Sequence, residues 1–216
     1  MERIVELNRG PFVGAAAPLE PVASPGGATV LDVRAPEAFA AGHVHGALNV
    51  PVSGSHFGTR AGFLLRSGER VVLHASDRVE AERAARGLHA IAFLELAGYL
   101  ADVPAPETME PVPIDELIRL LERHSVELVD VRELDERDSG YIPGSVNIPY
   151  RLVRARADQL PHDRPVVTIC ESGARAAIAA SVFAAAGFDA RPVLHAGIPD
   201  WEKRGNGTVH FRRCGA

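Results

Sequence analysis

The chain has 216 residues, enough for one large domain or two of ordinary size, and its 46% hydrophobic and 24% charged residues are typical of a globular protein. A net charge of −5 gives no general attraction to nucleic acid or anionic lipid. No apolar run is long enough to span a membrane, the first residues do not resemble a signal peptide, and two cysteines, Cys170 and Cys214, do not suggest a disulfide framework. We therefore expect a cytoplasmic protein with no nucleic-acid or membrane partner.

Apolar runs separated by glycine and proline predict alternating strands and helices in the first half of the chain. Residues 1–25 give no clear signal beyond a candidate edge strand at 4–7. After them we expect a strand at 30–33, a helix at 36–41, a partly helical segment at 57–65, a strand at 71–74, a helix at 79–86 and a strand at 90–94, with Gly98 closing the domain. A linker follows at 103–113, where four prolines in eleven residues keep the chain extended and rather stiff.

The second half shows the same alternation. It opens with an amphipathic helix at 114–121, in which Leu117, Leu120 and Leu121 share one face. We then expect a strand at 127–131, a turn at 140–149, a helix near 152–160, a strand at 166–169, a helix at 174–186 ending at Gly187, a strand at 191–195, and a closing helix that begins near Asp200. Trp201 of that helix is predicted to pack against the sheet as a core residue.

An internal repeat explains this similarity. The segment at 30–51, which includes Val30-Leu31-Asp32-Val33-Arg34, recurs 98 positions later, and the copies agree at Asp, Val, Arg, two glycines, Asn and Pro. A period of this size means a duplicated domain rather than a solenoid. The sequence thus predicts two α/β domains, at 1–102 and 114–216, each with a mostly parallel sheet flanked by helices.

The candidate reactive group is Cys170, at the end of the strand at 166–169. A cysteine between a strand end and a helix start lies where main-chain N–H groups converge and the helix dipole is positive, and both effects favour a thiolate. Arg175 follows after four residues and adds a fixed cation. The alternative is a buried structural cysteine, the more common fate of a lone Cys.

The order Cys170-Glu171-Ser172-Gly173-Ala174-Arg175 resembles the active loop of the rhodanese (sulfurtransferase) family, in which a cysteine is followed by five residues that often end in arginine. Related Cdc25-type phosphatases and arsenate reductases have a loop one residue longer. A smaller ring of N–H donors fits a persulfide sulfur but not a tetrahedral phosphate, so the short loop favours sulfur chemistry. The whole chain is similar to two-domain rhodaneses, which implies two tandem rhodanese-like domains.

The resemblance implies a two-step transfer without a cofactor. Cys170 takes a sulfur from thiosulfate or a related persulfide donor and passes it to a thiol or cyanide. The loop amides from Glu171 through Ala176, including those of Ser172, Gly173, Ala174 and Arg175, are expected to bind the sulfur anion. Asp130 and Arg132 match the family's Asp-x-Arg segment and are assigned a supporting role, because Asp32 and Arg34 repeat them in the first copy.

Two features depart from the family pattern. Glu171 places a carboxylate beside the nucleophile, which makes an anionic donor such as thiosulfate less favoured and a thiol persulfide plausible. Ala176 replaces a hydroxyl residue that is common after the arginine, and removes a helix-start hydrogen bond worth ~1 kcal/mol. Cys214 is expected to be an exposed free thiol near the terminus, and a resolving role for it is the alternative.

The first copy lacks this chemistry. Alignment of 71–74 with 166–169 places Ala75 at the position of Cys170 and Glu80 at that of Arg175. We therefore expect an inactive first domain, as in two-domain rhodaneses, which shapes the cleft over Cys170 or binds a partner. The pair His43 and His45 offers too few ligands for zinc, so no metal is expected.

The segment at 52–65 also looks like the corresponding part of proteins that fuse a metallo-β-lactamase-type persulfide dioxygenase to tandem rhodanese domains. This resemblance implies a persulfide dioxygenase or an acceptor protein as partner, beside a small sulfur donor and a thiol acceptor. Two other interpretations remain open at this point. One is a non-catalytic docking or sulfur-relay module, and the other is a cysteine phosphatase or arsenate reductase.

Overall fold

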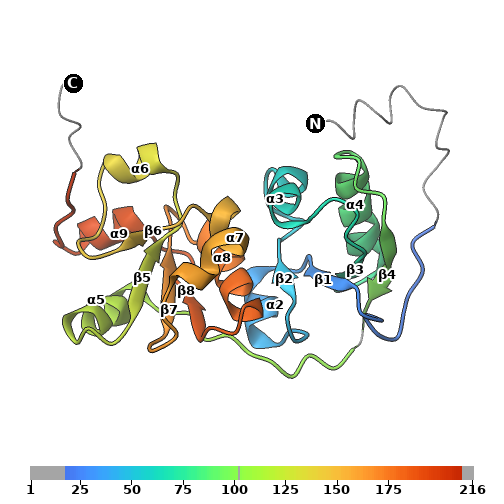
Figure 1. The fold of residues 1–216 in the computed structure, drawn as a ribbon, viewed down its shortest axis with the longest axis horizontal. Coiled ribbons are helices and arrows are strands. Elements are labelled where there is room, and N and C mark those ends of the chain that lie inside the picture. Colours follow the sequence, from blue (N-terminus) through green and yellow to red (C-terminus); the bar gives the residue numbers. More distant parts are fainter. Residues whose placement is uncertain (1–17, 102, 211–216) are drawn as a thin grey trace. The chain divides into compact units, whose positions relative to one another are not determined.

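The computed structural model describes residues 18–101 and 103–210. The chain divides into two compact units, Met1–Glu107 and Thr108–Ala216, each of which has its own sheet and core (Figure 1). The edge strand predicted at 4–7 and the predicted role of Cys214 lie outside the described residues. Among the described residues, no helix is both long enough and apolar enough to span a bilayer.

Unit 1 contains a parallel four-stranded sheet. Its elements are β1 (Thr29–Asp32), α2 (Pro36–Ala41), β2 (Leu48–Asn49), α3 (Phe57–Leu64), β3 (Val71–His74), α4 (Arg78–His89) and β4 (Leu96–Leu100). The strand order is β2-β1-β3-β4, and every pair is parallel. Pro36 opens α2 and Gly42 closes it, as predicted.

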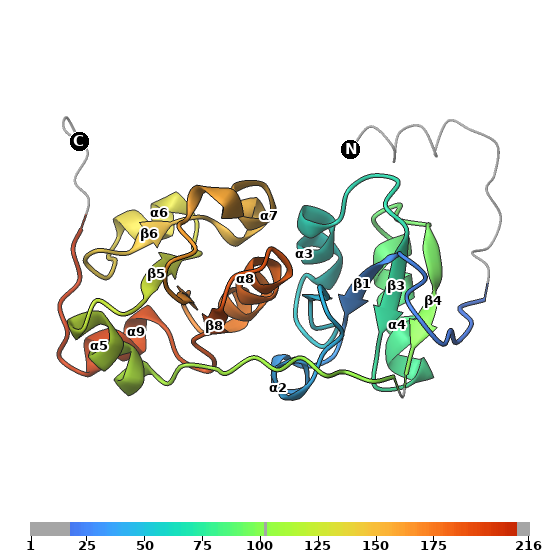
Figure 2. The ribbon, with the colours of Figure 1, turned by 60° about the horizontal axis from the view of Figure 1, so that its bottom comes forward.

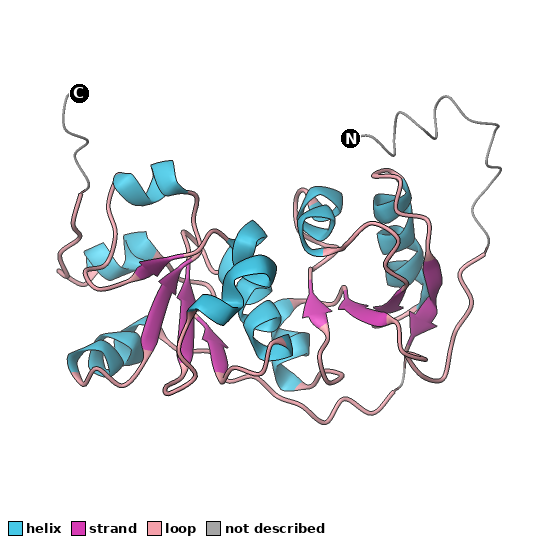
Figure 3. Ribbon diagram, in the orientation of Figure 1, coloured by secondary structure: helices cyan, strands magenta, loops and turns pink. Residues whose placement is uncertain are grey.

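Unit 2 repeats this topology. Its elements are α5 (Ile114–Glu122), β5 (Glu127–Asp130), α6 (Leu134–Asp138), β6 (Val146–Asn147), α7 (Val153–Arg156), β7 (Val166–Ile169), α8 (Ala174–Ala185), β8 (Ala190–Pro192) and α9 (Ile198–Lys203). The strand order β6-β5-β7-β8 is again fully parallel, which confirms the duplicated α/β fold. Figures 1 and 3 show α7 and α8 on one side of this sheet and α5 and α9 on the other.

Burial on both faces explains why the central strands are continuous apolar runs. All four residues of β7 are buried, and α8 is buried from Ala176 through Phe183 because it is apolar nearly all round. On the opposite face, Leu117 of α5 and Trp201 of α9 belong to one apolar cluster with Ile169 of β7. The predicted core role of Trp201, which is 7% exposed, is confirmed.

Three predicted elements were placed wrongly. The strand predicted at 90–94 is instead a turn, because α4 continues to His89 and the chain then passes through Ala92 with φ +61°; the strand lies at Leu96–Leu100 and contains Gly98. The helix predicted near 152–160 is a short helix between two 3₁₀ turns (Tyr150–Leu152 and Ala157–Gln159). The last strand ends at Pro192 rather than His195.

The proline-rich segment at 103–113 is shared between the units, and each part of it contacts the unit to which it belongs. Glu107 forms an antiparallel bridge with His43 of unit 1, and the amide of Val112 donates to the Pro192 carbonyl of unit 2 at 2.9 Å. Met109 and Val112 are buried. Packing of this kind, in addition to proline stiffness, keeps the segment extended. Figure 2 shows it as an extended stretch that leads into α5.

Candidate functional site

The sheet topology brings the loop that contains Cys170 beside the end of β5. In a parallel sheet the carboxyl ends of neighbouring strands share one edge, and β5 pairs with β7 with Asp130 opposite Ile169. The chain therefore leaves β5 toward Arg132 and leaves β7 into the loop at the same place. The first turn of α8 is tied to β7 because the Thr168 hydroxyl donates to the Ala176 carbonyl at 2.9 Å.

Main-chain geometry directs an amide at the sulfur. Gly173 takes φ +92°, a conformation that glycine adopts without strain, and its N–H donates to Cys170 Sγ at 3.2 Å. Cys170 itself is 1% exposed, whereas Glu171 and Ser172 are exposed. The sulfur thus lies at the floor of the loop, at the amino end of α8, where an amide and the helix dipole both favour a negative charge.

The segment between β8 and α9 supports the loop from behind. The amide of Ile198 donates to the Cys170 carbonyl at 3.1 Å. A Cβ on Gly197 would lie 2.2 Å from the Glu171 carbonyl oxygen, and a Cβ on Gly173 would lie 2.7 Å from the His195 amide nitrogen. Both glycines are required by this close approach of two backbones. His195, which follows β8, is exposed.

Arg175 is held by Glu136 of α6. Its two terminal nitrogens donate to Glu136 Oε2 and Oε1 at 2.5 and 2.6 Å, the bidentate geometry that best fixes a guanidinium. The hydrogen bond from Arg175 lowers the pKa of Glu136. The same bond raises the pKa of Arg175, to which the side chain of Cys170 adds a smaller effect. The cation therefore stays charged and close to the sulfur.

Asp130 and Arg132 form a hydrogen-bond network in unit 2, and Asp32 and Arg34 form the equivalent network in unit 1. Arg132 makes a bidentate contact with buried Asp130 and donates to the Gly140 carbonyl at 2.6 Å, as Arg34 does with Asp32 and the Gly42 carbonyl at 2.7 Å. Because unit 1 has no cysteine at the corresponding position, this network serves the fold. In unit 2, Arg132 has one further contact, since its Nη1 lies 3.8 Å from Glu171 Oε2.

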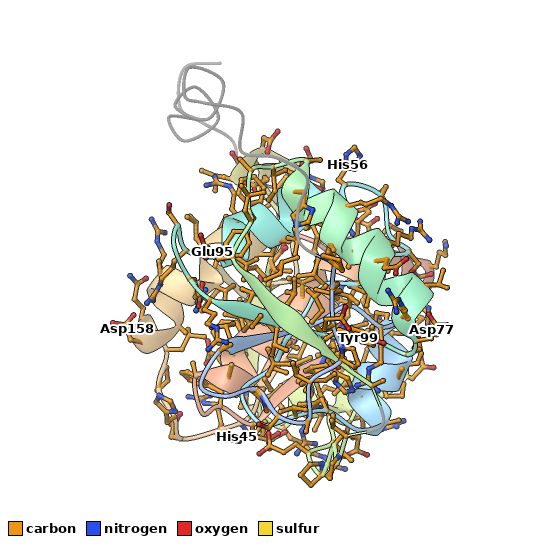
Figure 4. All side chains as sticks on the ribbon, turned by 90° about the vertical axis from the view of Figure 1, so that its right-hand side faces the viewer. His45, His56, Asp77, Glu95, Tyr99 and Asp158 are labelled. Atoms are coloured by element: carbon orange, nitrogen blue, oxygen red, sulfur yellow. The ribbon has the colours of Figure 1, made fainter. Side chains whose placement is uncertain are left out.

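In unit 1, the corresponding loop is filled by its own carboxylates. The amide of Ser76 donates to Glu80 Oε2 at 2.7 Å, and the amide of Glu80 donates to Asp77 Oδ1 at 2.8 Å. Figure 4 shows Asp77 at the start of α4. Ala75 is buried where unit 2 has its cysteine. An anion would meet negative charge here, so the loop has neither a nucleophile nor a place for a sulfur anion.

A buried histidine replaces an apolar residue beside the Asp-Arg pair of unit 1. His74 Nδ1 lies 3.0 Å from Asp32 Oδ2, whereas Ile169 occupies this position in unit 2. Burial acts to raise the pKa of Asp32, but the hydrogen bonds from His74 and Arg34 outweigh it, and the pKa lies below its ordinary value. His74 thus helps to hold the Asp32 carboxylate beside Arg34.

The described residues contain no group of three or more His, Cys, Asp and Glu side chains arranged for a metal. His43 is buried, stacks on Phe39 with 3.9 Å between ring centroids, and places Nδ1 3.0 Å from the Phe39 carbonyl oxygen. Burial lowers the pKa of His43. His45 instead pairs with Glu107 at 2.5 Å. Each histidine therefore has a structural partner.

A family model for the rhodanese-like domain matches residues 19–103 and 113–204, which is most of the chain. The chain belongs to the rhodanese family. A protein named sulfurtransferase from Allochromatium vinosum is 36% identical over 87 residues, covering 40% of this chain and 81% of the relative. Thiosulfate sulfurtransferase GlpE from Shewanella oneidensis is 29% identical over 90 residues, covering 42% and 89%. The structure of the human single-domain sulfurtransferase TSTD1 is similar, at 26% identity and a TM-score of 0.39, covering 44% and 96%.

Two residues that position the rhodanese loop were not found from the sequence. Glu136 could have been inferred from the repeat, because its counterpart in unit 1 is Ala38, while the counterpart of Arg175 is Glu80. Both members of the ion pair thus change together. Gly197 gave no comparable signal, since its role depends on how closely the segment after β8 approaches the loop.

Proposed function

We propose that the chain is a sulfurtransferase in which Cys170 carries the transferred sulfur as a persulfide. The observation that carries this proposal is the main-chain N–H of Gly173 aimed at Sγ, in a loop fixed by Ile198 from behind and by the bidentate Arg175–Glu136 pair. The relatives named as sulfurtransferases support the general reaction.

The proposed reaction has two displacements at sulfur. The Cys170 thiolate attacks the outer sulfur of thiosulfate or of a related persulfide, the donor's S–S bond breaks, and sulfite or a thiolate leaves with the electron pair. A thiolate or cyanide then attacks the outer sulfur of the persulfide and returns Cys170 to the thiolate. The substrate-contacting atoms are the loop amides of residues 171–176, and neither step needs a metal or a redox cofactor.

Sulfur transfer from thiosulfate to cyanide, measured as thiocyanate, tests this proposal directly. The wild-type chain and Cys214→Ser are expected to turn over, whereas Cys170→Ser is expected to be inactive. Cys214→Ser is the matched control because it removes the chain's other thiol. Activity that survives in Cys170→Ser would refute the assignment of the nucleophile. Hydrolysis of an aryl phosphate by the wild type, lost in Cys170→Ser, would instead indicate a phosphatase.

We further propose that unit 1 is a docking module for a persulfide dioxygenase or an acceptor protein. Its loop is closed by Glu80, and Val79 in the same segment is 73% exposed, more than any other large apolar side chain among the described residues. Addition of the chain to such a dioxygenase is expected to change its oxygen uptake with a thiol persulfide. The substitution Val79→Asp should weaken the effect, and an unchanged effect would argue against this surface.

A further inference from the structure

A cavity of about 350 Å³ lies beside the Cys170 loop, and three of its wall residues are acidic whereas one is basic. Glu171 enters it from the loop, Glu136 from α6 and Glu202 from α9, with Arg132 as the cation that faces it. Ile198, another wall residue, donates its amide to the Cys170 carbonyl. A molecule that reacts at the loop would thus have this cavity available for the rest of its structure.

Two arginines at the loop and the cavity, Arg132 and Arg175, are already neutralised. Arg132, 5% exposed at its side chain, makes its bidentate contact with fully buried Asp130, and Arg175 makes its own with Glu136. Each guanidinium is therefore matched by a carboxylate of its own. Neither has an uncompensated charge to offer an incoming anion.

Among the described residues, two carboxylates at the cavity lack a cation that pairs with them alone. The side chain of Glu171 is 53% exposed and reaches no closer than 3.8 Å to Arg132, which Asp130 already neutralises. Glu202 accepts a hydrogen bond from the uncharged Thr208 hydroxyl at 2.9 Å.

The nearest cations of α9 and α6 are engaged elsewhere. Lys203 pairs with Asp200 at 3.2 Å, and Arg204 pairs with Asp115. Arg137 of α6 lies over the Tyr141 ring, with its guanidinium carbon 3.6 Å from the ring centroid. Among the described residues, carboxylates at and around the cavity therefore outnumber cations, which favours a cation over an anion there.

We propose that this cavity binds the ammonium group of a cationic sulfur carrier, an aminothiol as acceptor and its persulfide as donor. Glu171 and Glu202 are the residues that determine this specificity. The inference rests on sulfur transfer through Cys170. The aminothiol thiolate attacks the outer sulfur of the Cys170 persulfide, the S–S bond breaks, and its electron pair returns to the cysteine. The product is the aminothiol persulfide, and no oxidant or reductant is consumed.

The test uses three small thiols that differ in charge: cysteamine (cationic), 2-mercaptoethanol (neutral) and 3-mercaptopropionate (anionic). The chain is loaded with excess thiosulfate, desalted, and mixed with each thiol, and loss of the extra sulfur is followed by intact mass. Thiols also differ in intrinsic reactivity. The measured quantity is therefore the ratio of the cysteamine rate to the 3-mercaptopropionate rate, compared between variants, so that intrinsic reactivity cancels.

In Glu171→Gln combined with Glu202→Gln, this ratio is expected to fall roughly tenfold, as removal of two nearby charges predicts. High salt should lower it in the wild type. Glu122→Gln is the matched control, because Glu122 is exposed at the end of α5, before β5 begins, and should leave the ratio unchanged.

Two results would overturn the inference in distinguishable ways. If Cys170 loads and transfers sulfur but the ratio is the same in the double variant, the charge selectivity is refuted while the sulfurtransferase stands. If Cys170 gains sulfur neither from thiosulfate nor from cysteamine persulfide, the proposed function fails and the inference fails with it.

Discussion

The substitution Gly197→Ala tests whether the backbone behind the loop sets the position of the nucleophile. The added methyl carbon would lie 2.2 Å from the Glu171 carbonyl oxygen and 2.3 Å from that of Cys170, and such contacts essentially never fall below 3.0 Å. Because both atoms belong to the backbone, the loop must move by roughly 1 Å, a misplacement that costs about 10²-fold in rate. Overpacking of this kind also destabilises a domain by about 1–3 kcal/mol.

Gly207→Ala is the matched control, because a Cβ at Gly207 meets no atom within 4 Å. Thiocyanate formation gives kcat/KM for each variant, and urea unfolding followed by circular dichroism separates lost activity from lost structure. We expect Gly197→Ala to be folded at low urea and about 10²-fold slower than Gly207→Ala. Equal activity in the two variants would refute the argument that Gly197 fixes the loop.

Three further predictions concern the ion pair behind the Cys170 loop, the closed loop of unit 1 and the buried His43. Glu136→Gln should lower kcat/KM roughly fivefold, as loss of a partly buried bidentate pair with Arg175 suggests; an unchanged rate would show that the pair does not position the loop. Ala75→Cys should give unit 1 little activity in a Cys170→Ser background, because Glu80 still occupies the loop amide, and robust thiocyanate formation would contradict this. Burial lowers the pKa of His43 below its ordinary 6.5, so the folded unit favours the neutral ring. The resulting stability is present above about pH 6.5 and is lost as the pH falls through the lower folded value, as urea unfolding near pH 7 and pH 5 would show; a pH dependence unaffected by His43→Gln would be the contrary result.

The sequence was sufficient for the α/β class and the duplication because buried parallel strands are continuous apolar runs and the repeat preserves its Asp-x-Arg segment. Strand boundaries were harder to predict where no glycine or proline separates a helix from the next strand. The run from Ile91 to Leu94 is as apolar as a strand, yet α4 reaches His89 and Ala92 turns the chain with φ +61°. Nothing in local composition records that the strand begins only at Leu96.

The candidate loop was visible because its residues are contiguous, whereas its supports come from distant elements. Glu136 lies 39 positions from Arg175, and only the paired change in unit 1 hints at their contact. Gly197 acts through its lack of a Cβ, which lets two backbone segments approach each other, and no residue pattern in the sequence indicates this contact. Glu80 could be read as an unfavourable charge, but its hydrogen bond to the Ser76 amide required the structure.

Intact mass and peptide mapping after incubation with thiosulfate show directly whether Cys170 carries the sulfur. We expect a gain of one sulfur atom, located on the peptide that contains Cys170 and removed by cyanide. The gain should persist in Cys214→Ser and be absent in Cys170→Ser. A sulfur located on Cys214, or a chain that gains no sulfur from thiosulfate or from any thiol persulfide, would show that Cys170 is not the sulfur carrier.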